Sequence, residues 1–326
     1  MRVLIVGCGY VGLPLGAELA RLGHQVLGLR RSRLAEAEMQ AAGIIPLHAD
    51  VTQPETLASL PRNFDWVVNC TASGGGGADD YRKIYLEGNR NLVSWLRATP
   101  VQKFVYTSST SVYAQNDGSV VAEDSPAQPD SPTAKVLVET ENLLLAVACP
   151  LIPSFSPNGR EGGRRPVEGE YNQQRSSARH EFPAIILRVA GIYGPGRGYA
   201  LKQFLRGEAR LEGDGSRFLN MIHRDDLIGA IMAALQHGEP GNIYNAADDA
   251  PVSQHEFYGW LAGQLKHPLP ASVPADAASW RKRGVTNKRV SNAKLRTQLK
   301  YEFQFPDYRA GYAAAVAQAL AANAAL

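Results

Sequence analysis

The sequence predicts an α/β protein built on a parallel sheet with helices on both faces. Short apolar runs typical of buried strands recur through the first half, helical patterns separate them, and a glycine-rich turn joins the first strand to the first helix. Strands separated by helical crossovers form parallel sheets. With 326 residues, the chain has room for one large domain and a smaller appendage.

The glycine turn comes first along the chain. An apolar run leads into Gly7, Gly9 and Gly12, which have G-x-G-x-x-G spacing. An amphipathic helix at residues 13–22 and a strand at 25–29 then complete a βαβ unit of roughly 30 residues. Such a turn brings backbone amides to a pyrophosphate at the helix N-terminus. We therefore expect a dinucleotide site that includes Gly7, Gly9, Tyr10, Val11 and Gly12.

The end of the second strand selects the nucleotide. A carboxylate there holds a free ribose 2′-hydroxyl, but this chain has Arg30, Arg31 and Ser32. Two guanidiniums and a hydroxyl suit a 2′-phosphate, which favours NADP(H) over NAD(H). The alternative is that these arginines are a solvated start to the next helix.

The alternation continues through the first half. Further strands are expected at residues 44–48, 66–69, 104–107 and 184–188, helices at 34–42, 81–96 and 133–148, and a turn at 50–54. Ligands bind beyond the carboxyl ends of such strands. The positions expected to line the cofactor there are Asp50, Val51, Cys70, Thr71, Ala72 and Thr107.

The domain organisation follows from changes in composition. We expect a dinucleotide-binding domain at residues 1–189, with a flexible surface insertion at 150–181 that is rich in proline, glycine and arginine. A smaller substrate-side domain is expected at 190–217 and 247–326, while 218–246 returns to the first domain. The basic stretch at 281–300 is either a phosphate-binding segment or a solvated face.

Composition excludes several classes of protein. A net charge of +3 is too small and too evenly spread to indicate nucleic-acid binding. No apolar run approaches the roughly 20 residues that span a bilayer, and no signal peptide is recognisable, so we expect a cytoplasmic protein without a membrane segment. Cys8, Cys70 and Cys149 lack metal-ligand spacing and are expected to be reduced thiols.

Hydroxyl groups cluster just beyond the strand at residues 104–107. The segment 104–114 reads FVYTSSTSVYA, and its serines follow a strand whose carboxyl end should lie near the nicotinamide. A hydroxyl there can bond to a substrate oxygen at the carbon that exchanges a hydride. Serines after strands are also ordinary turn formers.

At these residues the chain resembles the extended short-chain dehydrogenase/reductase family, in its NAD(P)-dependent epimerase/dehydratase branch and most closely a YeeZ-like subgroup. The similar segments span nearly the whole chain and include GCGYVG at residues 7–12, TSSTSVYA at 107–114, LRVAGIYGPG at 187–196, GDGS at 213–216 and IHRDDL at 222–227. The resemblance implies a Rossmann-type fold, a nicotinamide cofactor, a carbonyl or sugar-nucleotide substrate and a homodimer through the helices at 81–96 and 133–148.

The resemblance also implies a catalytic serine or threonine and a Y-x-x-x-K pair. These fall on Ser109 and Lys135, and the resemblance implies that Lys135 also holds the nicotinamide ribose. The tyrosine position falls on Ser131, so the proton donor is missing. A serine hydroxyl is shorter and far less acidic than a phenol. Four other phenols are candidates for the role: Tyr113, Tyr171, Tyr193 and Tyr199.

A second departure follows the strand at 184–188. The family often has an asparagine in R-x-x-N-V-Y-G-P that contacts substrate, whereas Gly191 occupies this position here. His223 and Asp226 are expected to be structural. No metal site is expected from them, because the neighbouring carboxylates Asp225 and Asp226 point to different faces of a helix.

Two functions remain open from the sequence. The first is an NADP(H)-dependent oxidoreductase or epimerase that acts on a carbonyl or sugar-like substrate through Ser109 and Lys135. The second is a non-catalytic NADP(H)-binding sensor or regulator that lost the tyrosine of the catalytic pair. Binding the cofactor does not by itself decide between them.

Overall fold

Seven parallel strands form the central sheet, in the order β12-β7-β5-β4-β1-β2-β3. The computed structural model describes residues 1–99, 101–146, 182–274 and 286–324. The strands are β1 (Arg2–Val6), β2 (Gln25–Arg30), β3 (Ile44–His48), β4 (Trp66–Asn69), β5 (Lys103–Ser109), β7 (Ala184–Val189) and β12 (Ile243–Ala246). This is the doubly wound α/β fold that the sequence predicts. Six of the strands lie where they were expected, and β12 falls in the segment 218–246 that was expected to return to the first domain.

Burial on both faces explains why the central strand β1 is apolar at successive positions. In β1, Leu4 and Val6 pack into one hydrophobic core, while Val3 and Ile5 pack into the other. All four side chains are at most 1% exposed. Alternate side chains of a strand point to opposite faces, so a sheet covered twice requires apolar residues at every position.

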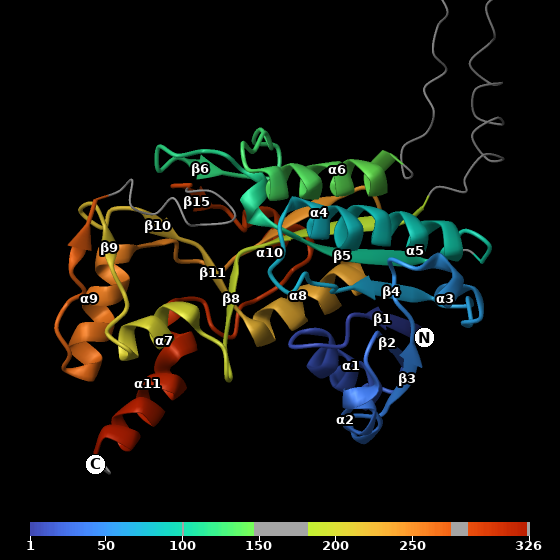
Figure 1. Ribbon diagram of the computed structural model, residues 1–326, viewed down its shortest axis with the longest axis horizontal. Coiled ribbons are helices and arrows are strands. Elements are labelled where there is room, and N and C mark those ends of the chain that lie inside the picture. Colours follow the sequence, from blue (N-terminus) through green and yellow to red (C-terminus); the bar gives the residue numbers. More distant parts are fainter. Residues whose placement is uncertain (100, 147–181, 275–285, 325–326) are drawn as a thin grey trace, which may run out of the picture.

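Helices cover both faces of the sheet. In Figure 1, α4, α5 and α6 lie on one side of it and α1, α2 and α8 on the other. The helical segments of this layer are α1 (Gly12–Arg21), η1 (Arg33–Ala35), α2 (Glu36–Ala41), α3 (Pro54–Ala58), α4 (Ala78–Tyr81), η2 (Arg82–Glu87), α5 (Gly88–Leu96), η3 (Thr110–Val112), α6 (Pro132–Ala146), α8 (Arg224–His237) and α10 (Ala293–Gln298).

Three local details differ from the sequence expectation. The helix expected at 34–42 begins as the 3₁₀ turn η1, because the Ser32 hydroxyl accepts a hydrogen bond from the Leu34 amide at 3.2 Å. The helix expected at 81–96 begins three residues earlier and contains a π-helical stretch, η2. The short helix α3 was not predicted, although Pro54 occupies its first turn, where proline is favoured.

A second lobe packs beside the carboxyl ends of the strands (Figure 1). Its core joins α7, α9 and α11 around aromatic side chains such as Phe257 and Tyr308. The remaining elements are β6 (Val120–Val121), β8 (Gly191–Tyr193), α7 (Tyr199–Leu205), β9 (Leu211–Glu212), β10 (Phe218–Leu219), β11 (Met221–His223), β13 (Val252–Ser253), α9 (Gln254–Leu265), β14 (Ser272–Val273), β15 (Arg289–Val290) and α11 (Tyr308–Ala324).

The segment 218–246 is divided between the two parts. Strands β10 and β11 pair with β13 and β8 outside the large sheet, whereas α8 packs on that sheet and β12 forms its edge. The expected insertion at 150–181 lies outside the described residues, as do Cys149 and Tyr171.

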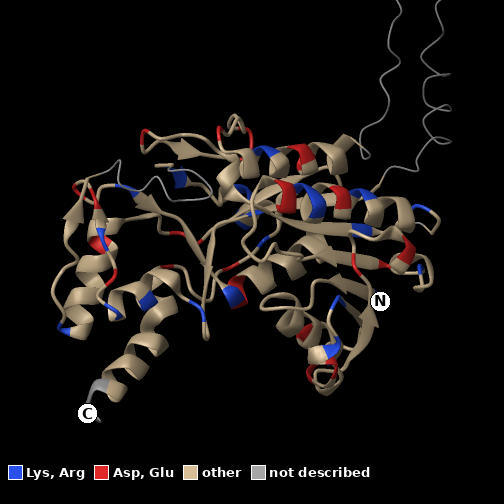
Figure 2. Ribbon diagram, viewed as in Figure 1, with Lys and Arg blue, Asp and Glu red and all other residues tan. Residues whose placement is uncertain are grey.

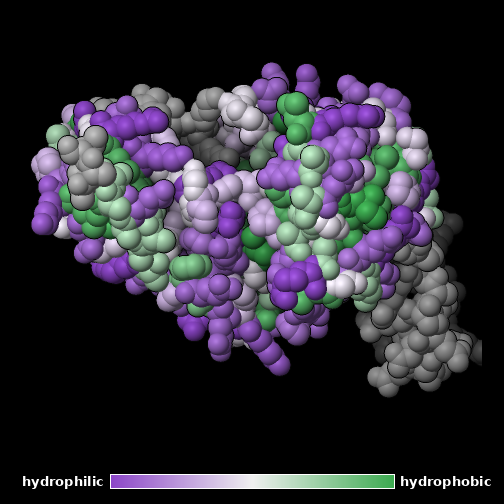
Figure 3. Space-filling model, turned by 90° about the horizontal axis from the view of Figure 1, so that it is seen from below, coloured by the Kyte–Doolittle hydropathy of each residue, from purple (hydrophilic) through white to green (hydrophobic). Residues whose placement is uncertain are grey.

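The surface carries charges of both signs. Acidic and basic residues are interspersed over the elements (Figure 2), and hydrophilic residues cover most of the face seen in Figure 3. Among the described residues, no helix has both the length and the apolar character that crossing a bilayer requires.

Candidate functional site

The glycine turn between β1 and α1 is shaped by close backbone approaches. Gly7 has a φ of +89°, and a Cβ there would lie 2.9 Å from the backbone of Cys70 and Thr71. A Cβ on Gly12 would lie 2.4 Å from the Gly7 carbonyl oxygen. At Gly9 a Cβ would meet no atom within 4 Å, so this glycine borders open space at the N-terminal end of α1. The turn therefore has the form that holds a phosphate group against backbone amides.

A cavity of about 850 Å³ extends from this turn along the carboxyl ends of the strands. It brings together most of the positions expected to hold a cofactor. Those that line it are Gly7, Gly9, Tyr10, Val11, Arg30, Arg31, Ser32, Asp50, Val51, Cys70, Thr71, Ala72 and Thr107. Gly12 lies beneath the turn instead, where it allows the close packing just described.

The basic residues at the end of β2 differ in how freely their side chains can move. The Arg30 guanidinium is half-buried and donates from Nη1 to the Cys8 carbonyl oxygen at 3.0 Å, so it also supports the glycine turn. The Arg31 side chain is 68% exposed, and its Nη1 lies 3.8 Å from Asp50 Oδ2. Asp50 is fixed in turn by the amide and hydroxyl of Thr52, which donate to Oδ1. Arg31 is thus the cation that can reorient toward a ligand.

Neither described thiol at the cavity is a nucleophile near neutral pH. Burial raises the pKa of both Cys8 and Cys70 to about 12. A thiol must lose its proton to react, so both behave as small apolar groups. Thr107 beside them donates its hydroxyl to the Asn69 carbonyl oxygen at 3.1 Å.

Ser109 lies on the cavity at the end of β5, where the sequence placed a catalytic hydroxyl. Its Oγ accepts a hydrogen bond from the Ser111 amide at 3.2 Å, at the start of the 3₁₀ turn η3. The hydroxyl of the preceding Ser108 donates to Glu141 Oε1 on α6 at 2.5 Å. The position of Ser109 is therefore set by contacts on both sides along the chain.

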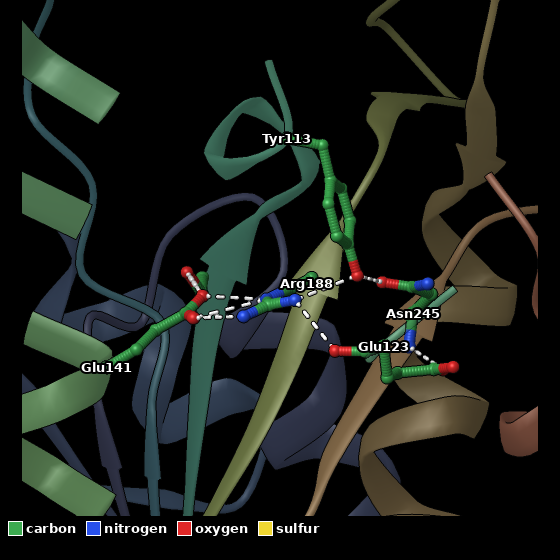
Figure 4. Close-up of polar contacts among 6 residues, drawn as sticks. Tyr113, Glu123, Glu141, Arg188 and Asn245 are labelled. Carbon is green, nitrogen blue, oxygen red and sulfur yellow. Dashed lines mark hydrogen bonds and ion pairs between the residues drawn. The ribbon is translucent and has the colours of Figure 1, made fainter. Parts of the chain in front are cut away.

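A buried polar network holds this strand end (Figure 4). Arg188 of β7 donates from Nη2 to Glu141 Oε2 at 2.8 Å and from Nη1 to the Tyr113 hydroxyl at 2.8 Å. The Tyr113 hydroxyl donates to Asn245 Oδ1 on β12 at 2.8 Å. Both charged side chains of the ion pair are at most 5% exposed. The network ties β5, α6, β7 and β12 together beside Ser109.

Helix α6 does not bring Ser131 and Lys135 to the cavity. Neither residue lines it, and Lys135 is exposed, whereas Leu137 borders the cavity and Glu141, one turn later, faces the network. Two positions along a helix turn a side chain by roughly 200°, so Lys135 lies on the opposite face from Leu137. The structure therefore places Lys135 on the exposed face of α6, away from the cavity where its expected role would require it.

The candidate phenols that the structure describes differ in their contacts and in their access to the cavity. Tyr113 is locked in the network, and it does not line the cavity. Tyr193 lines the cavity but stacks on Tyr312 with ring centroids 4.4 Å apart, and burial raises the pKa of its hydroxyl, which makes it a weaker acid. Tyr199 lines the cavity and is 63% exposed.

His223 and Asp226 have structural contacts. His223 Nδ1 accepts from the Asp225 amide at 3.3 Å and caps α8. Asp226 accepts from the Tyr301 hydroxyl and from the amides of Gln304 and Phe305, all within 2.9 Å. The described residues contain no group of three His, Cys, Asp or Glu side chains suited to a metal ion.

The sequence analysis missed two basic residues of the cavity. Lys288 and Arg217 both line it, and Lys288 is only 4% exposed. The basic stretch at 281–300 was the available signal, but its residues differ in burial, which the sequence alone does not reveal. Lys288 reaches the site because β15 pairs with β6.

Comparisons with known proteins agree with this arrangement. The model of the NAD dependent epimerase/dehydratase family matches residues 3–145. Protein YeeZ of Escherichia coli strain K12 is 27% identical over 314 residues, which cover 94% of this chain and 97% of YeeZ.

Two solved structures extend the likeness over the whole chain. A protein from Methylobacillus flagellatus, described as a candidate NAD-dependent epimerase/dehydratase, is 32% identical with a TM-score of 0.71, covering 97% of this chain and 98% of that one. The dTDP-glucose 4,6-dehydratase DesIV of Streptomyces venezuelae, solved with NAD and TYD bound, has a TM-score of 0.76 at 21% identity, covering 100% and 98%. At that identity the second likeness shows the fold.

Proposed function

The chain belongs to the NAD-dependent epimerase/dehydratase family, and we propose that it binds NADP(H) and exchanges a hydride with a carbonyl or sugar-like substrate next to Ser109. The observation that carries this proposal is the single cavity lined both by the glycine turn and by Ser109. A dinucleotide cradle that opens toward a hydroxyl at a strand end suits hydride transfer.

The preference for NADP(H) rests on Arg31 and Ser32. Both line the cavity at the end of β2, and the mainly exposed Arg31 has one long ion pair that it can exchange for a phosphate. A guanidinium binds phosphate through charge-assisted hydrogen bonds. Arg30 contributes its charge nearby, although its Nη1 is already bonded to Cys8.

The substrate side favours an oxygen-rich molecule. Ser109 presents a hydroxyl to a substrate oxygen, and the cationic Arg217 and Lys288 line the same cavity. DesIV, which shares the fold, acts on dTDP-glucose. A sugar nucleotide or a smaller carbonyl compound carrying an anionic group fits these side chains.

A second candidate function is a sensor that binds NADP(H) without turnover. One observation favours it: α6 turns Leu137 toward the cavity, where an acid–base pair on this helix would have to lie. A leucine cannot donate a proton, so activity would require a donor from another element.

The cofactor proposal is tested by Arg31→Asp. The introduced carboxylate would repel a 2′-phosphate, so we expect the Kd for NADPH to rise by about tenfold or more while the Kd for NADH changes little. Fluorescence titration of both cofactors measures this. Arg33→Asp is the matched control, because it makes the same charge change at an exposed arginine that does not line the cavity. Equal losses of NADPH and NADH binding in Arg31→Asp would contradict the preference.

The choice between enzyme and sensor is tested with Ser109→Ala. Wild-type protein should oxidise NADPH in the presence of at least one member of a panel of carbonyl compounds and keto sugars. Loss of the hydroxyl should lower kcat by about 100-fold without weakening NADPH binding. Ser59→Ala, at an exposed position directly after α3, is the control. If wild-type protein binds NADPH but reduces nothing in the panel, the sensor function is the better account.

A further inference from the structure

Lys288 is a buried cation whose ammonium group makes two hydrogen bonds inside the protein. Its ammonium Nζ donates to the Tyr113 carbonyl oxygen at 2.9 Å and to Thr286 Oγ1 at 2.8 Å. An ammonium group has three donors, so these two bonds leave one N–H. Because Lys288 lines the cavity, the remaining donor can serve a molecule bound there.

The backbone around Lys288 is held as firmly as its side chain. The Asn220 side chain donates from Nδ2 to the Lys288 carbonyl oxygen at 2.9 Å, and its Oδ1 accepts from the Val290 amide at 2.7 Å. Strand pairing between β15 and β6 fixes the next two residues. A donor fixed in this way loses little freedom when it binds a ligand.

No carboxylate pairs with Lys288 in the part of the chain that the structure describes. The charged group that acts on it is Arg217, another cation, which forms its own ion pair with Glu212 at 2.9 Å. Arg289 points elsewhere, since its Nε donates to the Gly118 carbonyl oxygen. Burial first and Arg217 second lower the pKa of Lys288 from 10.5 to about 8. Such an amine gains and loses a proton readily near neutral pH.

Lys288 and Ser109 are connected through one short turn. Ser109 precedes the 3₁₀ helix η3, and Tyr113, whose carbonyl oxygen accepts the lysine N–H, follows it directly. Both ends of η3 are therefore fixed by groups that also border the cavity. Ser109 and Lys288 also line the same cavity.

We propose that Lys288 is the proton donor and acceptor for the substrate oxygen, acting with Ser109 in place of the tyrosine–lysine pair that α6 lacks. This inference rests on the proposed hydride-transfer function and identifies the group that makes it possible. It assigns to the 286–290 segment a role that the family pattern gives to α6.

In a carbonyl reduction, Lys288 would supply the proton and bound NADPH the hydride. NADPH, when bound, supplies the hydride that forms the new C–H bond at the carbonyl carbon. As the carbonyl π pair moves to oxygen, the Lys288 ammonium gives that oxygen a proton, and an alcohol results. The neutral lysine then recovers a proton from water. In the reverse direction the neutral amine removes the alcohol proton.

Kinetics of carbonyl reduction test this role directly, with the panel member that wild-type protein reduces as the probe. Lys288→Met should lower kcat by about 100-fold or more and leave NADPH binding unchanged. Reduction needs the charged ammonium, so wild-type kcat should be level below pH 8 and fall above it. The reverse oxidation should rise through the same range, and both inflections should be absent from the variant.

Lys288→Arg separates proton transfer from simple attraction of an anion. Arginine keeps the charge but does not release its proton near neutral pH, so kcat should stay low while KM is largely retained. Full kcat in this variant would overturn the proton-transfer role. Lys294→Met, which changes a neighbouring lysine on α10 that does not line the cavity, should behave like wild-type protein.

A measurement without turnover provides the second readout. In protein labelled with 13C-lysine, the ε-carbon signal that disappears in Lys288→Met should titrate near pH 8, and those of exposed lysines about two units higher. The inference would be overturned if Lys288 titrated at the same pH as the exposed lysines, or if kcat were unchanged in Lys288→Met. Either result would leave the proposed function standing. Absence of any wild-type reduction would instead refute the proposed function, and the role of Lys288 with it.

Discussion

Arg188 and Glu141 form a charged pair that is almost completely removed from water. The two side chains meet through three hydrogen bonds, and the remaining Arg188 donor Nη1 bonds to the Tyr113 hydroxyl. A buried pair is tolerated only when its hydrogen bonds are satisfied, and removing one member leaves an uncompensated charge. This pair therefore fixes the strand end that carries Ser109, and the loss of either charged side chain should strongly destabilise the fold.

We predict that Glu141→Ala lowers the free energy of unfolding by about 3–5 kcal/mol, because it leaves the Arg188 guanidinium buried without its carboxylate. Urea unfolding followed by circular dichroism measures the loss. Glu139→Ala on the same helix is the matched control, since its partner Arg82 is exposed and such pairs contribute about 0–1 kcal/mol. Similar losses in the two variants would show that burial does not govern the strength of this pair.

The β1–α1 turn shows how one motif divides its glycines between binding and packing. Gly9 faces open space, whereas Gly12 is pressed against the Gly7 carbonyl oxygen and the Ile5 side chain. The spacing G-x-G-x-x-G predicted both tasks, because the geometry of the turn is local to the sequence. The structure adds the contact that confines Gly7, where a Cβ would lie 2.9 Å from the backbone of Cys70 and Thr71.

We predict opposite outcomes for Gly9→Ala and Gly12→Ala. The added methyl group at Gly9 meets no protein atom, so stability should be retained while NADPH binding weakens because the methyl group occupies the phosphate position. At Gly12 the methyl group collides with backbone, and overpacking of this kind costs about 1–3 kcal/mol. Thermal unfolding and NADPH titration of both variants distinguish the two effects. Unweakened NADPH binding in Gly9→Ala would contradict a phosphate position above the turn.

Helix α6 illustrates where a sequence pattern loses its predictive value. Its extent was expected at residues 133–148 and is observed from Pro132 to Ala146. The residue match to the family instead placed Lys135 at the reaction centre, and the helix directs Leu137 there. A shift of two positions leaves the helical pattern almost intact but turns the side chain to the other face.

The candidate site combines residues from distant parts of the chain. The Lys288 ammonium and the Tyr113 carbonyl are separated by 175 positions in the sequence. Asn245, which completes the network at Tyr113, comes from the edge strand β12. Pairing of β15 with β6, and of β12 with β7, brings these groups together.

A homodimer through the helices at 81–96 and 133–148 remains a prediction of the family resemblance. These helices lie side by side, and the Arg82–Glu139 pair joins them at 2.8 Å. Sedimentation velocity should then give the mass of two chains. Ser94→Trp, a bulky change at an exposed position of α5, should release single chains, whereas Ser59→Trp directly after α3 should not. A wild-type protein that sediments as one chain would refute the dimer.

The local sequence was sufficient to predict the strands, the glycine turn and the basic residues at the end of β2. Each of these depends on neighbours within a few residues: uninterrupted apolar runs for buried strands, glycines where the backbone turns, and Arg30, Arg31 and Ser32 at a strand end. The phase of α6 and the burial of Lys288 were decided by tertiary packing. They depend on which helix face meets the sheet and on water being excluded by segments far away in sequence, and no local pattern encodes either. The same packing buried one lysine of a basic stretch, Lys288, on the cavity that Ser109 also lines, and left Lys135 exposed.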